Sequence, residues 1–295
     1  MKSRVLLGFV LIASLMTGVF VVSAQQDEDV RGAFLESRPK TTNLKGPSRR
    51  HRRRPAKTNA NTNAAANNAT TPTVTATSRP VSKKAQPAIG LGYTIFMREP
   101  SGRALRVEPT REFRKGDRVR LALEPNVDGY LYIFGSENGA AARMIFPDWS
   151  LDGGENWIEA HVPIEVPSSE EAEEHQRWFV FKGDPATDRI YVVVTREPLT
   201  GVPTAEELVA FCGLNKDKCP WQPQADVWSE IEKATKAQVR VATTQNFGQA
   251  QTEREKVAMT RGLGLDKSMP QPSVIRINAS SNEPMLVTVL DLVYK

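Results

Sequence analysis

The sequence predicts a mostly β protein whose folded part is an antiparallel β-sandwich, immunoglobulin-like or of a similar type. Three observations indicate this fold. Beyond residue 89, most runs alternate apolar and polar residues with period two, they are rich in Val, Ile, Tyr, Phe and Trp, and Gly, Pro, Asn or Asp bounds most of them. Short strands at this spacing are typical of sandwiches and barrels, whereas alternating βα units need longer helical runs. A small helical elaboration is expected near residues 204–262.

The first 24 residues have the pattern of a secretory signal peptide. Lys2 and Arg4 precede a mainly apolar run, and Val22 and Ala24 stand at positions −3 and −1 of an expected cleavage site. The apolar run is also about long enough to stay as an uncleaved membrane anchor, at roughly 18 residues. We therefore expect an exported protein, periplasmic or extracellular. A membrane contact is expected only through this segment, if it is retained.

Residues 25–87 are expected to be a disordered basic linker, rich in Asn, Ala and Thr. Neither "KGPSRRHRRRPAK" nor "TNANTNAAANNATTPTVTATS" has enough apolar surface to offset an ordering cost of about 1–2 kcal/mol per residue. The simplest role is a solvated spacer that lifts the domain off a surface. The alternative is binding of an anionic polymer through Arg49, Arg50, Arg52, Arg53 and Arg54.

Charge is distributed unevenly along the chain. The net charge of the whole chain is +5, yet the excess of Lys and Arg lies before residue 88, and the remainder is mildly acidic. No aromatic residue interleaves with the arginines to stack on bases. Nucleic acid is therefore not expected among the partners.

Residues 88–295 are the predicted domain. Within 117–125, Val119, Leu121 and Leu123 are expected to face the core, and Arg118, Arg120 and Glu124 the solvent. Strands are expected at 92–99, 103–109, 117–125, 129–137, 142–148, 156–166, 177–183 and 189–197, with closing strands at 273–280 and 284–294.

The stretch "PNVDG" at 125–129 is expected to join two of these strands as a hairpin. Pro125 lacks an N–H and ends pairing, and Asp128-Gly129 is expected to supply a positive φ for a tight reversal. The strand that follows is apolar on both faces in "GYLYIF", which is typical of a strand inside its sheet. The run "VVV" at 192–194 has the same character.

A helical insertion is expected at 199–270. Thr204 and Glu207 form one capping box, with Gly213 at the end of that helix, and Thr252 and Glu255 form another, ended by Gly262. Between them, residues 226–238 place Val227, Ile231 and Ala234 on one helix face.

Cys212 and Cys219 are the two cysteines of the chain. In an exported protein such a pair is expected to form a disulfide, which for so short a loop contributes about 2–3 kcal/mol. It would connect the first helix to the loop before the second. Two thiols without a nearby His pair do not predict a zinc site.

Catalytic chemistry has little support in the sequence. The histidines are His51, His161 and His175, and no Gly-x-Ser-x-Gly elbow is present. The acidic run at 170–175 lacks the ligand spacing of a calcium loop. No catalytic residue, metal or cofactor is therefore predicted.

The run "FRKGDRVRLALEPNVDGYLYIFGSENGAAARMIFPD", followed by "RWFVFKG" and "RIYVVVTREP", resembles the bacterial family called domain of unknown function 4384. The resemblance covers residues 92–198. It implies an all-β accessory module, found in exported proteins or attached to kinase-like or caspase-like domains, with no agreed catalytic residues. The positions that match the family pattern are Gly116, Asp117, Asp128, Gly129, Tyr130, Phe146 and Pro147.

These observations predict an exported, non-catalytic binding or interaction module of the bacterial cell envelope, with a protein or an envelope glycan as partner. The loop "WSLDGGENW" is the predicted binding site, through Trp149, Asp152, Glu155 and Trp157, because Trp offers a flat apolar platform. A hairpin turn with two packed tryptophans is the alternative for this loop. For the protein, the alternatives are a structural surface protein that assembles by its edge strands, or an enzyme of unfamiliar chemistry.

Overall fold

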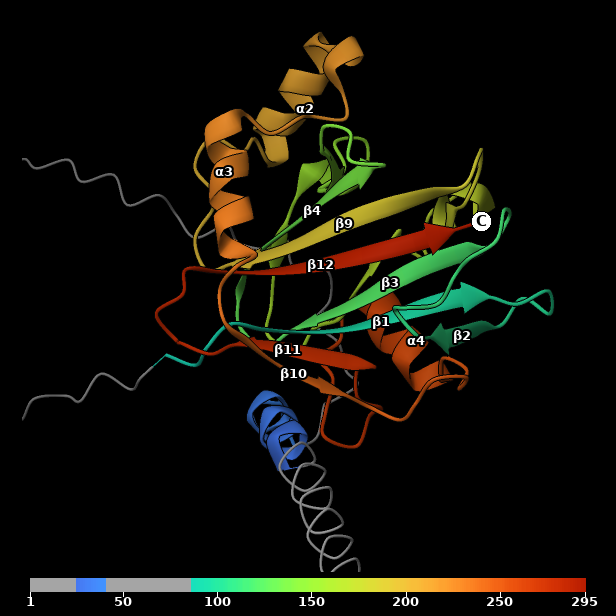
Figure 1. Cartoon of the computed structure of the whole chain (residues 1–295), viewed down its shortest axis with the longest axis vertical. Helices are drawn as coiled ribbons and strands as arrows, with labels where there is room; N and C mark the ends of the chain where they lie inside the picture. The colour runs from blue at the N-terminus through green and yellow to red at the C-terminus, as the bar shows by residue number, and fades with distance from the viewer. Residues whose placement is uncertain (1–24, 41–85) are drawn as a thin grey trace, which may run out of the picture.

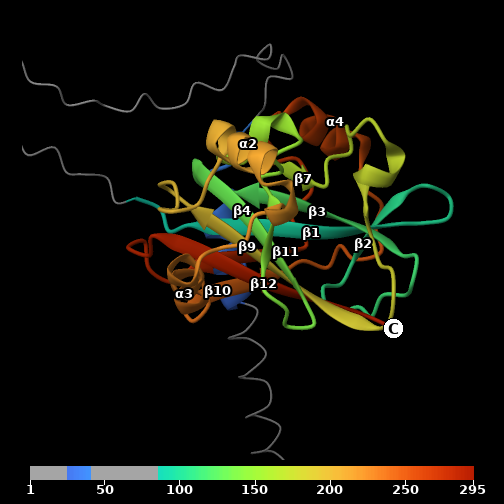
Figure 2. The ribbon, with the colours of Figure 1, turned by 90° about the horizontal axis from the view of Figure 1, so that it is seen from above.

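The structure is a computed structural model that describes residues 25–40 and 86–295. Two antiparallel sheets pack face to face, with helices on the outside (Figure 1), and Figure 2 shows the strands of one sheet running obliquely over those of the other. The predicted mostly β sandwich with a small helical elaboration is confirmed. The predicted signal peptide, residues 1–24, and the arginines at 49–54 lie outside the described residues.

The first sheet has the strand order β10–β11–β1–β3–β7 in the described residues, with β2 beside β1 and β8 beside β3. Its strands are β1 (Gly90–Arg98), β2 (Ala104–Val107), β3 (Arg118–Pro125), β7 (Ile164–Val166), β8 (Phe179–Val180), β10 (Val239–Thr243) and β11 (Val274–Asn278). Strand β10 lies inside the insertion at 199–270 that was expected to be helical. The prediction is wrong for these residues, because they pair with β11 as a strand.

The second sheet has the order β12–β9–β4–β5, with β6 beside β4. Its strands are β4 (Gly129–Glu137), β5 (Arg143–Phe146), β6 (Trp157–Ile158), β9 (Ala186–Thr195) and β12 (Met285–Tyr294). Both β4 and β9 have a neighbour on each side, as the apolar character of both their faces predicted.

The predicted hairpin between β3 and β4 is wrong. Strand β3 pairs with β1 and β4 pairs with β9, so residues 125–129 cross from one sheet to the other. Gly129 is needed for close approach and not for a positive φ, because a Cβ at this position would lie 2.0 Å from the carbonyl oxygen of Thr195. Asp128 also stays out of the left-handed region, and its Oδ1 accepts from the N–H of Ala160 at 2.7 Å.

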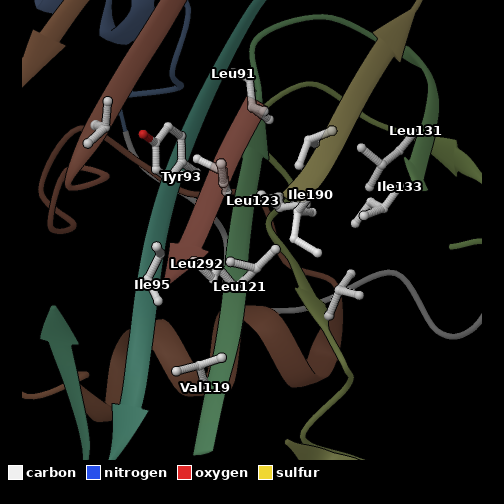
Figure 3. Packing of buried hydrophobic residues seen from close by; sticks show 14 of the residues in the cluster. Leu91, Tyr93, Ile95, Val119, Leu121, Leu123, Leu131, Ile133, Ile190 and Leu292 are labelled. Carbon is white, nitrogen blue, oxygen red and sulfur yellow. The ribbon is translucent and has the colours of Figure 1, made fainter. Parts of the chain in front are cut away.

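The core between the sheets is built from alternate residues of both. Leu121 and Leu123 of β3 face Leu131 and Ile133 of β4, and all four are at most 1% exposed (Figure 3). Burial of each such side chain contributes about 1.5–3 kcal/mol. The period-two pattern therefore predicted this layer correctly.

The outward face of β3 is solvated at Arg118, whose side chain is 43% exposed, but the prediction is wrong for Arg120 and Glu124. Arg120 is 5% and Glu124 is 3% exposed, because other segments cover this face. Arg120 lies 3.5 Å from Glu165 and its guanidinium stacks 4.0 Å from the ring centroid of Trp178. Burial lowers the pKa of Arg120 from its ordinary value, and Glu165 opposes this shift.

The helices cover the outer faces of the two sheets. They are α2 (Ala205–Leu214), α3 (Ala225–Ala234), α4 (Glu253–Arg261) and the short 3-10 turns η1 (Asp152–Gly154), η2 (Glu174–Arg177) and η3 (Lys216–Lys218). Helices α2 and α3 pack on β4, β9 and β12 through Leu208, Val227 and Ile231. No helix within residues 25–40 and 86–295 is long and apolar enough to cross a membrane.

The helix ends agree only partly with the sequence signals. The capping box of Thr252 and Glu255 forms, and Gly262 ends α4 with φ 58°. Thr204 stands at the N-cap of α2 but its side chain makes no capping bond, and α2 continues through Gly213 to Leu214. The predicted first capping box and the glycine stop are therefore wrong.

The prediction of a disordered segment is also wrong for residues 25–40. Residues 25–35 are helical and lie beside β10 and β11, drawn in blue in Figure 1. Val30 and Phe34 are fully buried against Ala242, Ile275 and Ile277. Alternate outward-facing apolar residues of β10 and β11 need a cover, and this short amphipathic helix supplies it.

Candidate binding groove

An open groove of about 770 Å³ lies on the outer face of the second sheet. Strands β4 and β9 and the turn after β4 form one side, and α3 with the loop before it forms the other. This volume is within the range of about 300–1,000 Å³ that is usual for small-molecule sites.

Two aromatic rings form the apolar part of the groove. Tyr191 of β9 and Trp228 of α3 are both partly exposed, and their ring centroids lie 4.8 Å apart in an edge-to-face arrangement. The ring of Phe134 also packs edge-to-face on Trp228, with the ring centroids 6.1 Å apart. The indole N–H of Trp228 donates to Oε1 of Glu232 at 3.0 Å, which fixes the orientation of the ring.

The polar part of the groove is held by a bidentate ion pair. Arg189 donates from Nε to Oδ1 of Asp291 at 2.6 Å and from Nη2 to Oδ2 at 2.9 Å. These bonds and the positive charge hold the pKa of Asp291 below its ordinary value and raise that of Arg189. Because Asp291 balances its charge, Arg189 offers the groove a polar surface and no isolated charge.

Amide side chains form another part of the polar lining. The side-chain oxygen of Gln222, in the orientation that satisfies both groups, accepts from the guanidinium of Arg143 at 3.2 and 3.3 Å. Asn138, at the turn after β4, accepts from the N–H of Thr187 at 3.0 Å. The groove therefore presents hydrogen-bonding groups next to flat apolar rings.

The disulfide stands just before the loop that carries Gln222 in the chain. Cys212 of α2 and Cys219 are bonded, as predicted, with their Cα atoms 5.7 Å apart. Two residues further along the chain, the carbonyl of buried Trp221 accepts from the N–H of Met144 at 2.8 Å. The loop is thus fixed both to α2 and to the edge of the second sheet.

Of the predicted loop residues, Trp149, Glu155 and Trp157 lie outside this groove. Trp157 lies in β6 and packs edge-to-face on Tyr130 at 5.1 Å, whereas Trp149 is 36% exposed. Glu155 is exposed, and the side chain of Asp152 is not among those described. The sequence signal for the groove was weak, because Tyr191 and Trp228 lie far apart in the chain and each fits an ordinary packing role.

A second polar constellation lies on the outer face of the first sheet. Nδ1 of His161 donates to Oε1 of Glu124 at 2.7 Å, since a carboxylate can only accept. The Ser37 hydroxyl donates to the carbonyl oxygen of Phe34 at 3.1 Å, and its oxygen lies 2.7 Å from Nε2 of His161. His161 itself has a left-handed φ of 57°. The order of groups resembles a nucleophile, base and acid.

We assign this constellation to the docking of residues 25–40. His161 and Glu124 are 2% and 3% exposed, and the groove involves neither of them nor Ser37. Sequence reasoning could not have found it, because Ser37 lies in a segment predicted to be disordered. Within residues 25–40 and 86–295, no three His, Cys, Asp or Glu side chains group as metal ligands.

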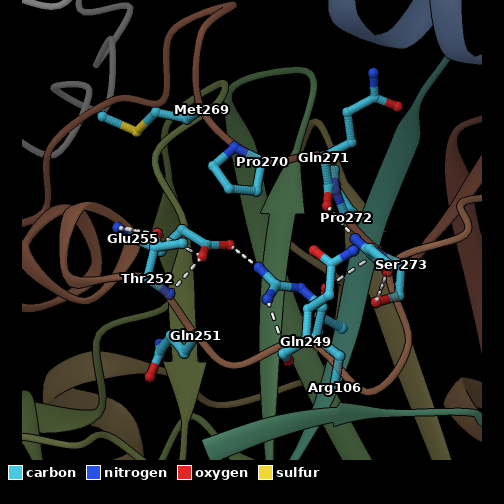
Figure 4. Close-up of polar contacts among 12 residues, drawn as sticks. Arg106, Gln249, Gln251, Thr252, Glu255, Met269, Pro270, Gln271, Pro272 and Ser273 are labelled. Atoms are coloured by element: carbon cyan, nitrogen blue, oxygen red, sulfur yellow. Dashed lines mark hydrogen bonds and ion pairs between the residues drawn. The ribbon is translucent and has the colours of Figure 1, made fainter.

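A third buried network fixes α4 to the first sheet (Figure 4). Arg106 pairs with Glu255 and donates from Nη1 to the carbonyl of Ala250 at 2.8 Å. Glu255 also accepts from the N–H and the hydroxyl of Thr252, at 2.9 and 2.7 Å. The adjoining cavity has a volume of only about 20 Å³, which is room for about one water molecule. This network is structural.

Residues 112–198 match the family model described as domain of unknown function (DUF4384). The resemblance to that family is thereby confirmed over these residues. No curated protein and no solved structure matches the chain. The matched region runs from before β3 to just after β9 and includes one side of the groove, whereas α3 and residues 25–40 lie outside it.

Proposed function

We propose that this protein is an exported, non-catalytic binding module of the bacterial cell envelope, and that the groove between α3 and strands β4 and β9 is its ligand site. The observation that carries the proposal is the pairing of Tyr191 and Trp228 with polar side chains in one groove of about 770 Å³. The match to domain of unknown function 4384 is compatible with an accessory role. The disulfide supports an oxidising compartment.

The lining favours an envelope glycan over an ionic ligand. Flat rings such as Trp228 stack on the apolar faces of sugars, while amides and guanidinium groups bond their hydroxyls. Asp291 compensates the charge of Arg189, so the groove does not select strongly for an anion. A segment of neutral or N-acetylated sugars fits this chemistry.

The test compares two kinds of tryptophan in the full chain. Binding to soluble peptidoglycan fragments and to chitin oligosaccharides is measured by calorimetry. We expect Trp228→Ala to weaken binding at least about tenfold, which corresponds to roughly 1.4 kcal/mol. Trp149→Ala is the matched control, since its ring is exposed outside the groove.

The same experiment decides the alternative placement of the site. Loss of binding in Trp149→Ala or Trp157→Ala, with Trp228→Ala unchanged, assigns the ligand to the loop predicted from the sequence and rejects the groove. Absence of binding to any glycan rejects the proposed ligand class. A structural role through edge strands would be supported by size-exclusion mobility well above that of a monomer.

Anionic-polymer binding through Arg49, Arg50, Arg52, Arg53 and Arg54 stays a separate prediction. Retention on heparin is expected to fall when all five are replaced by Ser, and equal retention would reject it. Neither result bears on the groove.

A further inference from the structure

The side chain of Arg38 occupies a site in which every one of its donors has an acceptor. Nε and Nη2 donate to the two carboxylate oxygens of Glu124 at 2.7 and 2.6 Å. Nη1 donates to the carbonyls of Asp266 and Met269 at 3.3 and 3.1 Å, and Nη2 also donates to that of Pro270 at 3.2 Å. A guanidinium has five N–H groups, and this site provides five bonds.

An apolar hollow beside that site holds Phe34. Its ring is fully buried and meets His161 edge-to-face at 5.4 Å between centroids. Gly92 of β1 makes room for it, because a Cβ there would lie 3.1 Å from Cζ of Phe34 and 2.3 Å from Cγ of Pro272. The edge of His161 and the space left by Gly92 therefore both accommodate the Phe34 ring.

Residues 25–40 add no strand to either sheet. In the described residues, every pairing of the two sheets joins strands that lie between 90 and 294. Residues 25–35 of the segment form a helix, and side chains make most of its contacts with the domain. One backbone hydrogen bond also joins the two, from the N–H of Lys267 to the carbonyl of Pro39 at 3.1 Å. Residues 25–40 therefore contact the domain as a bound peptide would, although they belong to the same chain.

We propose that the outer face of the first sheet is a peptide-recognition site, selective for a short helix that carries a phenylalanine near its end and is followed, four residues after that phenylalanine, by an arginine in the turn beyond the helix. Residues 25–40 occupy this site as a tethered ligand. The selectivity rests on the guanidinium. Lysine has three donors in a different geometry and cannot form the bidentate bond to Glu124 together with the three carbonyl contacts.

The test uses the full chain with a protease site introduced between residues 41 and 85 and cut after folding. A fluorescent peptide of residues 25–40 is then added, and its exchange with the native segment is followed by anisotropy. We expect the peptide to bind. The same peptide with Arg38→Lys should bind at least tenfold more weakly, and one with Glu36→Gln, which changes an exposed side chain, should bind as the original does.

Three results would overturn the proposal. Equal binding of the lysine peptide would show that no guanidinium is recognised. Failure of the labelled peptide to bind after the native segment has left would show that no separable site exists. Unfolding of the cut protein when the segment leaves, seen by circular dichroism, would make residues 25–40 a part of the fold and not a ligand. The groove binding of the proposed function is measured separately and does not depend on this result.

Discussion

Arg38 and Glu124 form a bidentate ion pair with both side chains almost completely buried, although 86 positions separate them in the chain. Glu124 also accepts from His161, so its carboxylate has three donated bonds. Removing the cationic partner while such a carboxylate stays buried costs about 3–5 kcal/mol. The pair therefore links the position of residues 25–40 to the stability of β3.

Replacing Arg38 by Ala should lower the free energy of unfolding by about 3–5 kcal/mol, because it leaves the buried carboxylate of Glu124 without the guanidinium that pairs with it. Chemical denaturation of the full chain measures this. Arg103→Ala is the control, since its pair with Glu99 is exposed and contributes less than about 1 kcal/mol. A change at Arg38 no larger than that of the control would show that the pair does not stabilise the fold.

Gly129→Ala should destabilise the protein by about 1–3 kcal/mol. The new methyl group cannot be placed beside the carbonyl of Thr195 without moving β4 away from β9. Gly213→Ala should act in the opposite direction. Gly213 lies inside α2 with nothing near its added Cβ, so alanine there stabilises the helix by about 0.5–1 kcal/mol. Thermal unfolding of the two variants checks the contrast, which would fail if both shifted the same way.

Replacing both Cys212 and Cys219 by Ala should lower the free energy of unfolding by about 2–3 kcal/mol. Reductant should bring the wild-type protein to the same value and leave the double variant unchanged, which separates the disulfide from packing effects. Urea titration with and without reductant measures this. A variant that responds to reductant, or a wild type that does not, would contradict the expectation.

The ion pair of Arg189 and Asp291 should make a small, pH-dependent contribution to stability. The pKa of Asp291 is lower in the folded protein than in the unfolded chain, so the contribution is present above the ordinary carboxyl pKa of about 3.9. It is lost as the pH falls through the lower folded value. Both side chains are more than 40% exposed, which limits the effect to about 1 kcal/mol or less.

The check is the stability difference between wild type and Asp291→Asn at low ionic strength. The difference should be present at neutral pH and should disappear in acid, where Asp291 is itself uncharged. Added salt should reduce it at neutral pH, because exposed charges are screened. A difference that persisted in strong acid would assign the effect of the substitution to packing and not to charge.

Local pattern predicted the features whose cause lies within a few residues. The alternation at 117–125 and the apolar run at 129–137 identified β3 and β4, and the alternation also identified the inward-facing Leu121 and Leu123. The spacing of Thr252 and Glu255 identified the start of α4, and the two cysteines identified the disulfide. In each case, neighbouring side chains and backbone groups are sufficient to determine the structure.

Tertiary contacts decided which strands pair, what covers each sheet and where the groove lies. Asp128-Gly129 has the composition of a tight turn, yet the chain crosses there from one sheet to the other, since β3 pairs with β1 and β4 pairs with β9. Arg120 and Glu124 have the pattern of a solvated face, but partners from distant segments bury them. Arg38, Tyr191 and Trp228 acquire their roles only where the fold brings separate segments together, because a period-two pattern specifies which way a side chain points and not what it meets.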